Sequence, residues 1–182
     1  QKLTKLITQN YNIYSSMTNI RTQFNSYDEM IQYNLKRYKE DFPEVNNIEY
    51  EIKDINKTIA TEGGVSAYFN IPALDSKAKK QIRVNPNARD IKKIDTYITV
   101  SHEGITGHMY QYAYTYAHNK SHYMKAIANN KGFTEGYAVY CQYYCLKYLD
   151  LDQNVLNAYK YNEILSYIAI MQADIGIHND GW

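Results

Sequence analysis

The sequence predicts a fold that is mainly α-helical, with a small antiparallel β element. Two observations lead to this prediction. Apolar side chains recur at intervals of three and four residues over most of the chain, which is the period of an amphipathic helix. Between residues 65 and 85, two short runs bounded by glycine and proline have the pattern of strands instead. The 182 residues, 45% hydrophobic and 21% charged, are enough for one globular domain with a core.

The first third of the chain is expected to be helical. Apolar residues follow helical spacing over residues 3–20, so one helix is predicted there. Ser26 with Glu29 three residues later is a capping box, which predicts the start of a second helix. Pro43 ends that helix, because the residue before a proline is disfavoured in the helical region. Residues 44–60 mix charges with isolated isoleucines and predict no definite element.

The middle of the chain predicts two strands, over residues 65–71 and 81–85, separated by a polar loop. We expect the two strands to pair antiparallel. Asn70 and Asn85 lie at the ends of these runs. They could flank an edge strand that holds an extended peptide through main-chain hydrogen bonds.

The remainder is predicted to be helical, over residues 91–106, 109–118, 133–149 and 154–177. No repeat or low-complexity linker marks a domain boundary. The chain is therefore expected to be a single domain of residues 1–182, with a helical N-terminal part over 1–60 and a metal-site region over 61–182. Because it begins with Gln1 and not with Met, we expect it to be a fragment of a longer protein.

Charge and hydropathy exclude several classes of function. The net charge of +1 gives no overall field for nucleic acid or an anionic membrane, and we expect neither as a partner. No apolar run approaches the roughly 20 residues of a membrane span. Cys141 and Cys145 lie four residues apart on one helical face, where a disulfide is awkward, so buried free thiols are expected. The sequence predicts no compartment.

The segment His102–His108 contains two histidines and a glutamate, and Thr134-Glu135-Gly136-Tyr137 follows later. Neutral imidazoles and a carboxylate suit Zn²⁺, and a second carboxylate can accept a proton from a water that the metal activates. These residue types therefore indicate a water-activating zinc site.

The spacing of the two histidines places a condition on the backbone. They are six residues apart, and an ideal helix would turn them about 120° away from each other. His102 and His108 could share a metal only if the helix bulges or ends between them. Gly104 and Gly107 would permit such a break. From the spacing alone, a glycine-interrupted helix with two polar histidines is an equally open alternative.

Four segments, in order, resemble the catalytic C-terminal region of the bacterial domain-of-unknown-function family 885 (DUF885). They are Ser66-Ala67-Tyr68-Phe69-Asn70 with Ile82-Arg83-Val84-Asn85, Thr99-Val100-Ser101-His102-Glu103 through Gly107-His108, Phe133-Thr134-Glu135-Gly136-Tyr137-Ala138-Val139-Tyr140, and Asp174-Ile175-Gly176-Ile177-His178 with Gly181-Trp182. The second resembles the family's His-Glu-x-x-Pro-Gly-His signature. Members of the family are regarded as zinc metallopeptidase-like proteins of the gluzincin type. The resemblance therefore implies a zincin-like catalytic region that acts on a peptide or a small peptide-like substrate.

The resemblance also implies roles for individual residues. His102, His108 and Glu135 would bind zinc, and Glu103 would be the general base. His178 would line the site and contact the substrate or the developing oxyanion, with Tyr140 a weaker candidate for that task. Asp174, one turn before His178, could orient it.

Four departures from the family pattern bear on activity. Thr106 replaces the proline of the signature, Met109 replaces a second histidine, Tyr137 a tryptophan and Ile170 an arginine. None of them removes a proposed ligand or Glu103. The changes at Thr106, Met109 and Ile170 favour one rival hypothesis, a non-catalytic relative that keeps metal for structure or binds peptide without cleaving it. A second rival is a helical interaction domain without metal.

Some candidate residues have simpler explanations. Glu135 would also suit the first turn of a helix, and His178 the last turn, because the helix dipole favours those charges there. His118 and His122 have the i, i+4 spacing of a helical metal pair, but no glutamate is adjacent and their surroundings indicate a loop.

Overall fold

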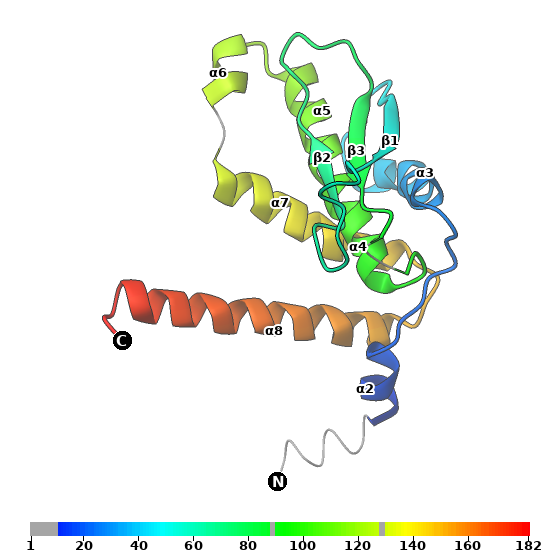
Figure 1. The fold of residues 1–182 in the computed structure, drawn as a ribbon, viewed down its shortest axis with the longest axis vertical. Coiled ribbons are helices and arrows are strands. Elements are labelled where there is room, and N and C mark those ends of the chain that lie inside the picture. The colour runs from blue at the N-terminus through cyan, green and yellow to red at the C-terminus, as the bar shows by residue number, and fades with distance from the viewer. Residues whose placement is uncertain (1–10, 88–89, 128–129) are drawn as a thin grey trace. The chain divides into compact units, whose positions relative to one another are not determined.

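The computed structural model describes residues 11–87, 90–127 and 130–182 (Figure 1). The chain divides into two compact units, and each is described by itself. One unit is Arg21–Leu149, and the other comprises the segment up to Ile20 together with Asp150–Trp182. The prediction of a mainly helical fold is confirmed. That the chain is a single domain stays a prediction.

Helix α3, Tyr27–Arg37, opens the larger unit and continues as a 3-10 turn over Tyr38–Glu40. The predicted cap is confirmed, because Ser26 Oγ accepts a hydrogen bond from Glu29 N at 3.1 Å. The helical segment ends before Pro43, as predicted.

Three strands form a mixed sheet in the order β1-β3-β2. The predicted antiparallel pair is present, formed by β2, Ala67–Asn70, and β3, Lys80–Val84. The expectation of a purely antiparallel element is wrong, however, because β1, Tyr50–Asp54, pairs parallel with β3. Tyr50 and Ile52 alternate with Glu51 and Lys53, which is a strand pattern, but it is short and lies among the charges of residues 44–60, and no strand was predicted there. None of the β1 side chains is fully buried.

Helix α4, Ile94–Glu103, lies at the centre of the larger unit and packs against α3, β2 and α7. The helices that follow it are α5, His108–His118, α6, His122–Ile127, and α7, Lys131–Tyr144, which continues as a 3-10 turn over Cys145–Tyr148. Helix α4 ends three residues earlier than predicted. Helix α6 was not predicted, although Ser121 caps it by accepting a hydrogen bond from Met124 N at 3.2 Å.

A buried polar network fixes the end of α4. Asn34, fully buried on α3, donates to Ser101 Oγ at 3.0 Å and to the carbonyl oxygen of Ile105 at 2.7 Å. The buried Tyr97 hydroxyl donates to Asn34 Oδ1 at 2.7 Å. Because buried polar groups are costly to leave unpaired, this network holds the segment after α4 in one place.

The other unit contains α2, Tyr11–Met17, and the long helix α8, Gln153–His178, which pack against each other. The helix predicted over residues 3–20 is therefore present as α2, and residues 1–10 lie outside the described part. Helix α8 confirms its predicted bounds to within one residue. After it, Trp182 N donates to the Gly176 carbonyl oxygen at 2.9 Å, and the indole covers Gly176 so closely that a Cβ there would lie 2.3 Å from it.

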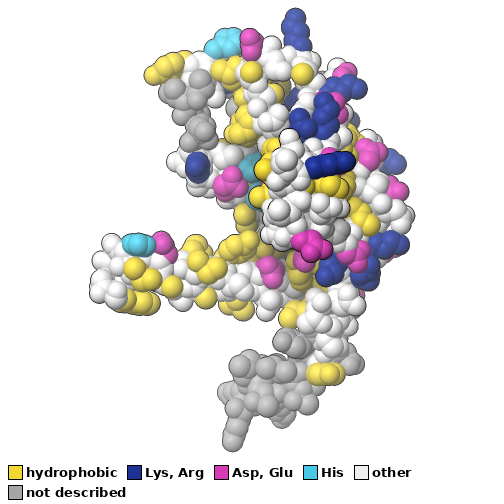
Figure 2. Space-filling view, in the orientation of Figure 1, with side chains coloured by type: hydrophobic (Ala, Val, Ile, Leu, Met, Phe, Trp, Pro, Cys, Tyr) yellow, Lys and Arg dark blue, Asp and Glu magenta, His cyan; other side chains and the backbone are white. Residues whose placement is uncertain are grey.

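On the face drawn in Figure 2, acidic and basic side chains are interspersed over the larger unit, and no patch of one sign dominates. Among the described residues, no helix is both long enough and apolar enough to cross a membrane.

Candidate metal centre

The backbone breaks between the two histidines, as the sequence requires for a shared site. Helix α4 ends at Glu103, and α5 begins at His108. In the connection, the Ile105–Thr106 peptide bond is cis. Gly107 N donates to the Ser101 carbonyl oxygen at 2.9 Å, so the chain folds back onto the end of α4.

Glycine is needed at position 107 because no side chain would fit there. A Cβ added there would lie 1.8 Å from the carbonyl oxygen of His102, well inside van der Waals contact. This oxygen belongs to the main chain of α4, which cannot move aside as a flexible side chain could. Gly107 thus allows the close return of the chain that carries His108 back towards His102.

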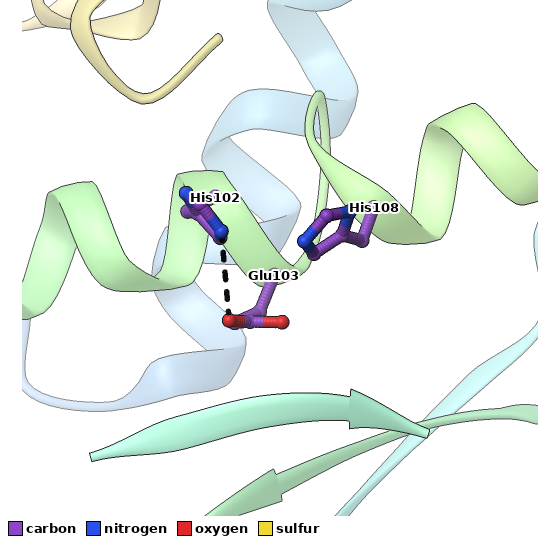
Figure 3. A group of neighbouring side chains, drawn as sticks. All are labelled: His102, Glu103 and His108. Carbon is purple, nitrogen blue, oxygen red and sulfur yellow. Dashed lines mark ion pairs between the residues drawn. The ribbon is translucent and has the colours of Figure 1, made fainter. Parts of the chain in front are cut away.

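This break brings the two imidazoles together (Figure 3). The ring centroids of His102 and His108 are 4.8 Å apart, with the ring planes nearly perpendicular at 89°. His108 is buried, and His102 is partly buried. The two histidines are therefore neighbours in space, although they are six residues apart in the sequence.

Two carboxylates lie beside the imidazole pair. Glu135 Oε2 is 3.4 Å from His102 Nε2 and 3.4 Å from His108 Nε2. Glu103 Oε1 is 3.8 Å from His102 Nε2. Glu135 is not in the first turn of α7, which begins at Lys131, so a helix-terminal role does not account for its position.

The other nitrogen of each imidazole is bonded to a glutamine. His102 Nδ1 lies 2.7 Å from Gln142 Oε1, and His108 Nδ1 lies 3.3 Å from Gln111 Oε1. An amide oxygen can only accept a hydrogen bond, so a hydrogen bond at either contact needs a proton on Nδ1. The Nε2 atoms lie on the other side of each ring, towards the carboxylates. Zinc-binding histidines in proteins usually have such a partner behind them.

Glu103 occupies a more enclosed position than Glu135. Its side chain is 15% exposed, whereas that of Glu135 is 60% exposed. Glu103 Oε2 accepts a hydrogen bond from Phe69 N of β2 at 2.7 Å. Burial raises the pKa of Glu103 above the usual glutamate value, while the nearby His102 and the Phe69 N–H oppose that rise.

The donor set and its spacing fit a zinc ion. Two atoms that bind a tetrahedral zinc ion at about 2.1 Å lie about 3.4 Å from each other. Both distances from Glu135 to the imidazoles have this value. Donor atoms of His102, Glu103 and His108 also lie within 4.8 Å of one another. We favour Glu135 over Glu103 as the third ligand, because it lies at equal distance from both imidazoles and Glu103 is held by β2.

A cavity of about 200 Å³ opens beside the histidine pair. It is lined by residues of β2, α4, α5 and α7 and of the segment after β2, namely Tyr68, Phe69, Ile71, Glu103, His108, Tyr112, Thr134 and Glu135. Strand β2 is at the edge of the sheet. A ligand in this cavity would therefore meet the carboxylates, one imidazole and the outer side of an edge strand together.

The other two predicted catalytic residues, Tyr140 and His178, lie in different units of the chain. Tyr140 lies on α7, but its side chain is 57% exposed, its ring packs against Tyr144 with centroids 5.5 Å apart, and it is not among the lining residues. His178 belongs to the other unit, where its Nε2 lies 3.6 Å from Asp174 Oδ1 one turn before it on α8. The part assigned to His178 in the site stays a prediction.

Two further expectations can be compared with the structure. Asn85 follows the central strand β3 and is buried, and its side-chain nitrogen donates to the carbonyl oxygens of Thr61 and Val65. It therefore holds a loop and does not flank an edge strand. His118 stacks on Tyr114, and its Nδ1 donates to the Tyr114 carbonyl oxygen at 2.9 Å. Among the residues that the structure describes, His118 and His122 belong to no metal-binding group.

Three residues of the site were not predicted from the sequence: Gln111, Tyr112 and Gln142. Tyr112 could have been found, because it lies four residues after His108 and so on the same face of α5. Its ring packs against Phe69 of β2 with centroids 5.8 Å apart. Gln142 could not, because its contact with His102 depends on how α7 packs against α4.

Comparisons with known proteins agree with the resemblance. The crystal structure of a candidate lipoprotein from Colwellia psychrerythraea superposes with a TM-score of 0.68 at 18% sequence identity, which shows similarity of fold alone. The match covers 97% of this chain and 28% of the Colwellia chain, so the sequence spans less than a third of that protein. No curated protein matches.

The family comparison covers nearly the whole chain. Residues 4–182 match the family described as "Bacterial protein of unknown function (DUF885)". All four segments that carry the resemblance lie within this range. The chain therefore belongs to the DUF885 family.

Proposed function

We propose that this chain is the catalytic region of a zinc-dependent hydrolase, a metallopeptidase of the gluzincin type with a zincin-like fold. The observation that carries the proposal is the placement of Glu135 Oε2 at 3.4 Å from Nε2 of both His102 and His108. Two neutral imidazoles and one carboxylate, with a further carboxylate adjacent, are a donor set found in catalytic zinc sites.

His102, His108 and Glu135 would hold the ion. When bound, zinc would polarise the scissile carbonyl group and lower the pKa of a water molecule. Glu103 accepts a proton from the attacking water and passes it to the leaving amine. The Phe69 N–H holds Glu103 Oε2, which leaves Oε1 on the side of the imidazoles for this task.

The cavity favours an extended peptide as substrate. Glu103 occupies the Phe69 N–H, but the rest of the outer edge of β2 can pair with a substrate main chain. Phe69, Ile71 and Tyr112 provide apolar walls. Burial and the charge of Glu135 raise the pKa of Tyr112, so its hydroxyl stays protonated and can donate to the substrate carbonyl oxygen. His178 remains a second candidate for that donation.

Zinc content and peptide turnover test the proposal together. The purified protein should hold one zinc per chain and cleave unstructured peptides, and a chelator should abolish cleavage until zinc is returned. Zinc held without turnover under any condition would favour the non-catalytic relative. Absence of zinc binding would favour the helical interaction domain.

One observation favours the non-catalytic rival. Met109, which stands where the family has a second histidine, is completely buried. The Met109 side chain packs in the core and offers no imidazole nitrogen to the site. Cleavage by the wild-type chain would show that a histidine at position 109 is not needed for activity.

A further inference from the structure

We propose that the cavity beside the two histidines selects peptides by one uncharged, apolar side chain next to the scissile bond, and that Ile71 is a specificity-determining residue. The selected side chain is aliphatic, such as that of leucine, or a single aromatic ring, such as that of phenylalanine. The inference rests on the proposed function for the position of the scissile bond. The preference for an apolar side chain also has a readout in binding, without metal or turnover.

The residues that line the cavity fall into two groups. The carboxylates of Glu103 and Glu135, with one imidazole, belong to the proposed catalytic centre. Phe69, Ile71 and Tyr112 present aromatic and aliphatic surface instead, and we call them the apolar wall. Because the first group would be engaged by the ion and the reacting atoms, the apolar wall is the part left to contact a substrate side chain.

Contacts within the larger unit hold the apolar wall in place. The rings of Phe69 and Tyr112 pack with centroids 5.8 Å apart, and the Tyr112 ring packs edge-on against Tyr116, also at 5.8 Å. The Tyr116 hydroxyl donates to the Pro72 carbonyl oxygen at 3.3 Å, which ties the segment that carries Ile71 to α5. The wall is thus formed in the free protein, and a preformed surface lowers the cost of ordering on binding.

Ile71 is the most accessible part of the apolar wall. Its residue is 53% exposed, whereas Phe69 is only 7% exposed and Tyr112 is partly buried. A substrate side chain that enters from solvent can therefore cover Ile71 and be covered by it. Each methylene group buried in this way is worth about fourfold in affinity. Ile71 is accordingly the residue of the wall whose replacement should change the preference most directly.

The volume of the cavity limits what it can hold. At about 200 Å³ it is smaller than the roughly 300–1,000 Å³ of pockets that take a drug-sized ligand. An engineered apolar cavity of about 150 Å³ takes one benzene molecule. The cavity therefore has room for one ring or one branched aliphatic chain. Neighbouring side chains of an extended peptide point to opposite faces, so only one of two adjacent residues would enter.

The charges at the cavity disfavour an acidic side chain. Among the described residues that line it, two are glutamates and none is a lysine or arginine. A substrate carboxylate there would be repelled and would find no cation as partner. Lysine is the rival, because the glutamates attract an ammonium group. We favour the apolar side chain, since the ion would engage Glu135, and Glu103 is held by the Phe69 N–H and is needed as the base.

Cleavage of a matched peptide series tests the preference. The blocked pentapeptides acetyl-Ala-Ala-X-Ala-Ala-amide, with leucine, phenylalanine, alanine, glutamate or lysine at X, carry no terminal charge. The zinc-loaded protein should cleave the leucine and phenylalanine peptides next to X. Their kcat/KM should exceed that of the alanine peptide by at least about 10-fold, because one methylene group in an apolar pocket is worth about 10- to 200-fold. The glutamate peptide should be the poorest substrate.

Binding of the same peptides gives a readout that is independent of zinc and turnover. Methyl NMR of the chelator-treated protein follows the Ile71 side chain during a titration. The leucine and phenylalanine peptides should shift its methyl signals to saturation, and the glutamate and lysine peptides should not. The dissociation constants should rank the leucine, phenylalanine and alanine peptides as their kcat/KM values do.

Matched variants separate selectivity from a general loss of structure. Ile71→Ala should lower kcat/KM for the leucine peptide by about fourfold or more and leave the alanine peptide nearly unchanged, so that the preference shrinks. Ile71→Leu keeps the apolar surface and should keep the preference. Ile59→Ala makes the same change at an isoleucine of the same unit that is 63% exposed and does not line the cavity, and should change neither peptide. Thermal unfolding shows whether each variant is folded.

The possible outcomes separate this inference from the proposed function. Cleavage with equal kcat/KM for all five peptides, or with a preference for lysine or glutamate, would overturn the inference and leave the proposed function in place. These wild-type rates need no variant, so they decide even if Ile71→Ala fails to fold. Selective binding of the leucine peptide without cleavage would support the apolar preference and refute the proposed function. A preference that is unchanged in a folded Ile71→Ala would overturn the assignment of Ile71.

Discussion

Glu103 and Glu135 differ in ways that suit them to different tasks. Glu103 is largely enclosed and receives a main-chain hydrogen bond, so its position is fixed in advance. Glu135 is more exposed and lies at equal distances from the two imidazoles. A general base is more effective when it is held in the position from which it accepts the proton. A metal ligand must instead lie at the correct distance from the other ligands.

Replacing Glu103 by glutamine separates binding from catalysis. The glutamine oxygen can still accept the hydrogen bond from Phe69 N, but the side chain cannot accept a proton at neutral pH. Glu103→Gln should therefore keep zinc and lose peptide turnover by about 10²- to 10⁴-fold. Metal analysis and initial rates on one peptide measure the two effects. Loss of zinc in this variant would mean that Glu103 is a ligand, and an unchanged rate would transfer the base role to another group.

Tyr112 and Tyr140 offer a comparison of two phenols on neighbouring helices. Tyr112 lines the cavity and Tyr140 does not. Removing one donor to a developing oxyanion typically costs about 10²- to 10³-fold in kcat. Tyr112→Phe should therefore lower kcat with little change in KM, and Tyr140→Phe should leave both unchanged. Steady-state kinetics of the two variants decide this, and the opposite ranking would return the role to Tyr140.

At the scale of elements, the break between α4 and α5 makes the site possible. Gly107→Ala would place a Cβ 1.8 Å from the His102 carbonyl oxygen, so the connection must move and the imidazoles must separate. We expect loss of most of the bound zinc and of about 1–3 kcal/mol of stability. Gly136→Ala is the matched control, since a Cβ there meets nothing within 4 Å in the middle of α7. It should retain zinc and gain about 0.5–1 kcal/mol.

The end of the α3 segment is tied to the turn after α7 through Asp41. Its carboxylate accepts hydrogen bonds from Lys147 Nζ and Tyr148 OH, both at 2.7 Å, and these bonds lower the pKa of Asp41. A lowered pKa in the folded state stabilises the fold above the unfolded pKa of about 3.9. That stabilisation is lost as the pH falls from this value through the folded pKa.

Asp41→Asn should therefore lower the free energy of unfolding at pH 7. It should also make this free energy fall less between pH 7 and pH 3 than it does in the wild type. Urea unfolding between pH 7 and pH 3 measures both effects as the difference from wild type. Asp75→Asn, at an exposed aspartate, is the control and should follow the wild-type curve. Parallel wild-type and Asp41→Asn curves over the whole range would show that these hydrogen bonds do not contribute through ionisation.

The elements that the sequence predicted well are those whose pattern is local. Helix α8 is long and periodic, and the Ser26 cap is a short-range hydrogen bond, so both could be inferred from neighbouring residues. Strand β1 has only a short alternation of Tyr50 and Ile52 with charged residues, and its stability comes from pairing with β3, 30 residues away, so this local pattern was not sufficient to predict it. The early end of α4 depends on Asn34 of α3, which holds the Ile105 carbonyl oxygen.

At the scale of the whole molecule, the site also combines residues that are close in the sequence with residues that only the fold brings together. His102, Glu103 and His108 lie within seven residues, so their chemistry could be recognised from the sequence, and the two glycines indicated the break. Glu135 was named beside them as a later carboxylate, but only the resemblance to a family implied that it is a ligand. Gln142 was not found at all, because its contact with His102 follows from the packing of α7 against α4. The sequence of each helix, taken by itself, does not predict which of its residues will contact the other helix.

Zinc should also act on the stability of the folded chain as a whole. The proposed ligands come from α4, α5 and α7, so an ion bound to all three would oppose unfolding of the larger unit. Binding at about 100 times the dissociation constant adds about 2.7 kcal/mol to the stability of the folded state. Thermal unfolding should therefore shift upward with added zinc and return to the metal-free value with chelator. The double variant His102→Ala with His108→Ala should show no such shift. A zinc-dependent shift that persists in this variant would mean that the ion binds elsewhere, and the assignment of this centre would be wrong.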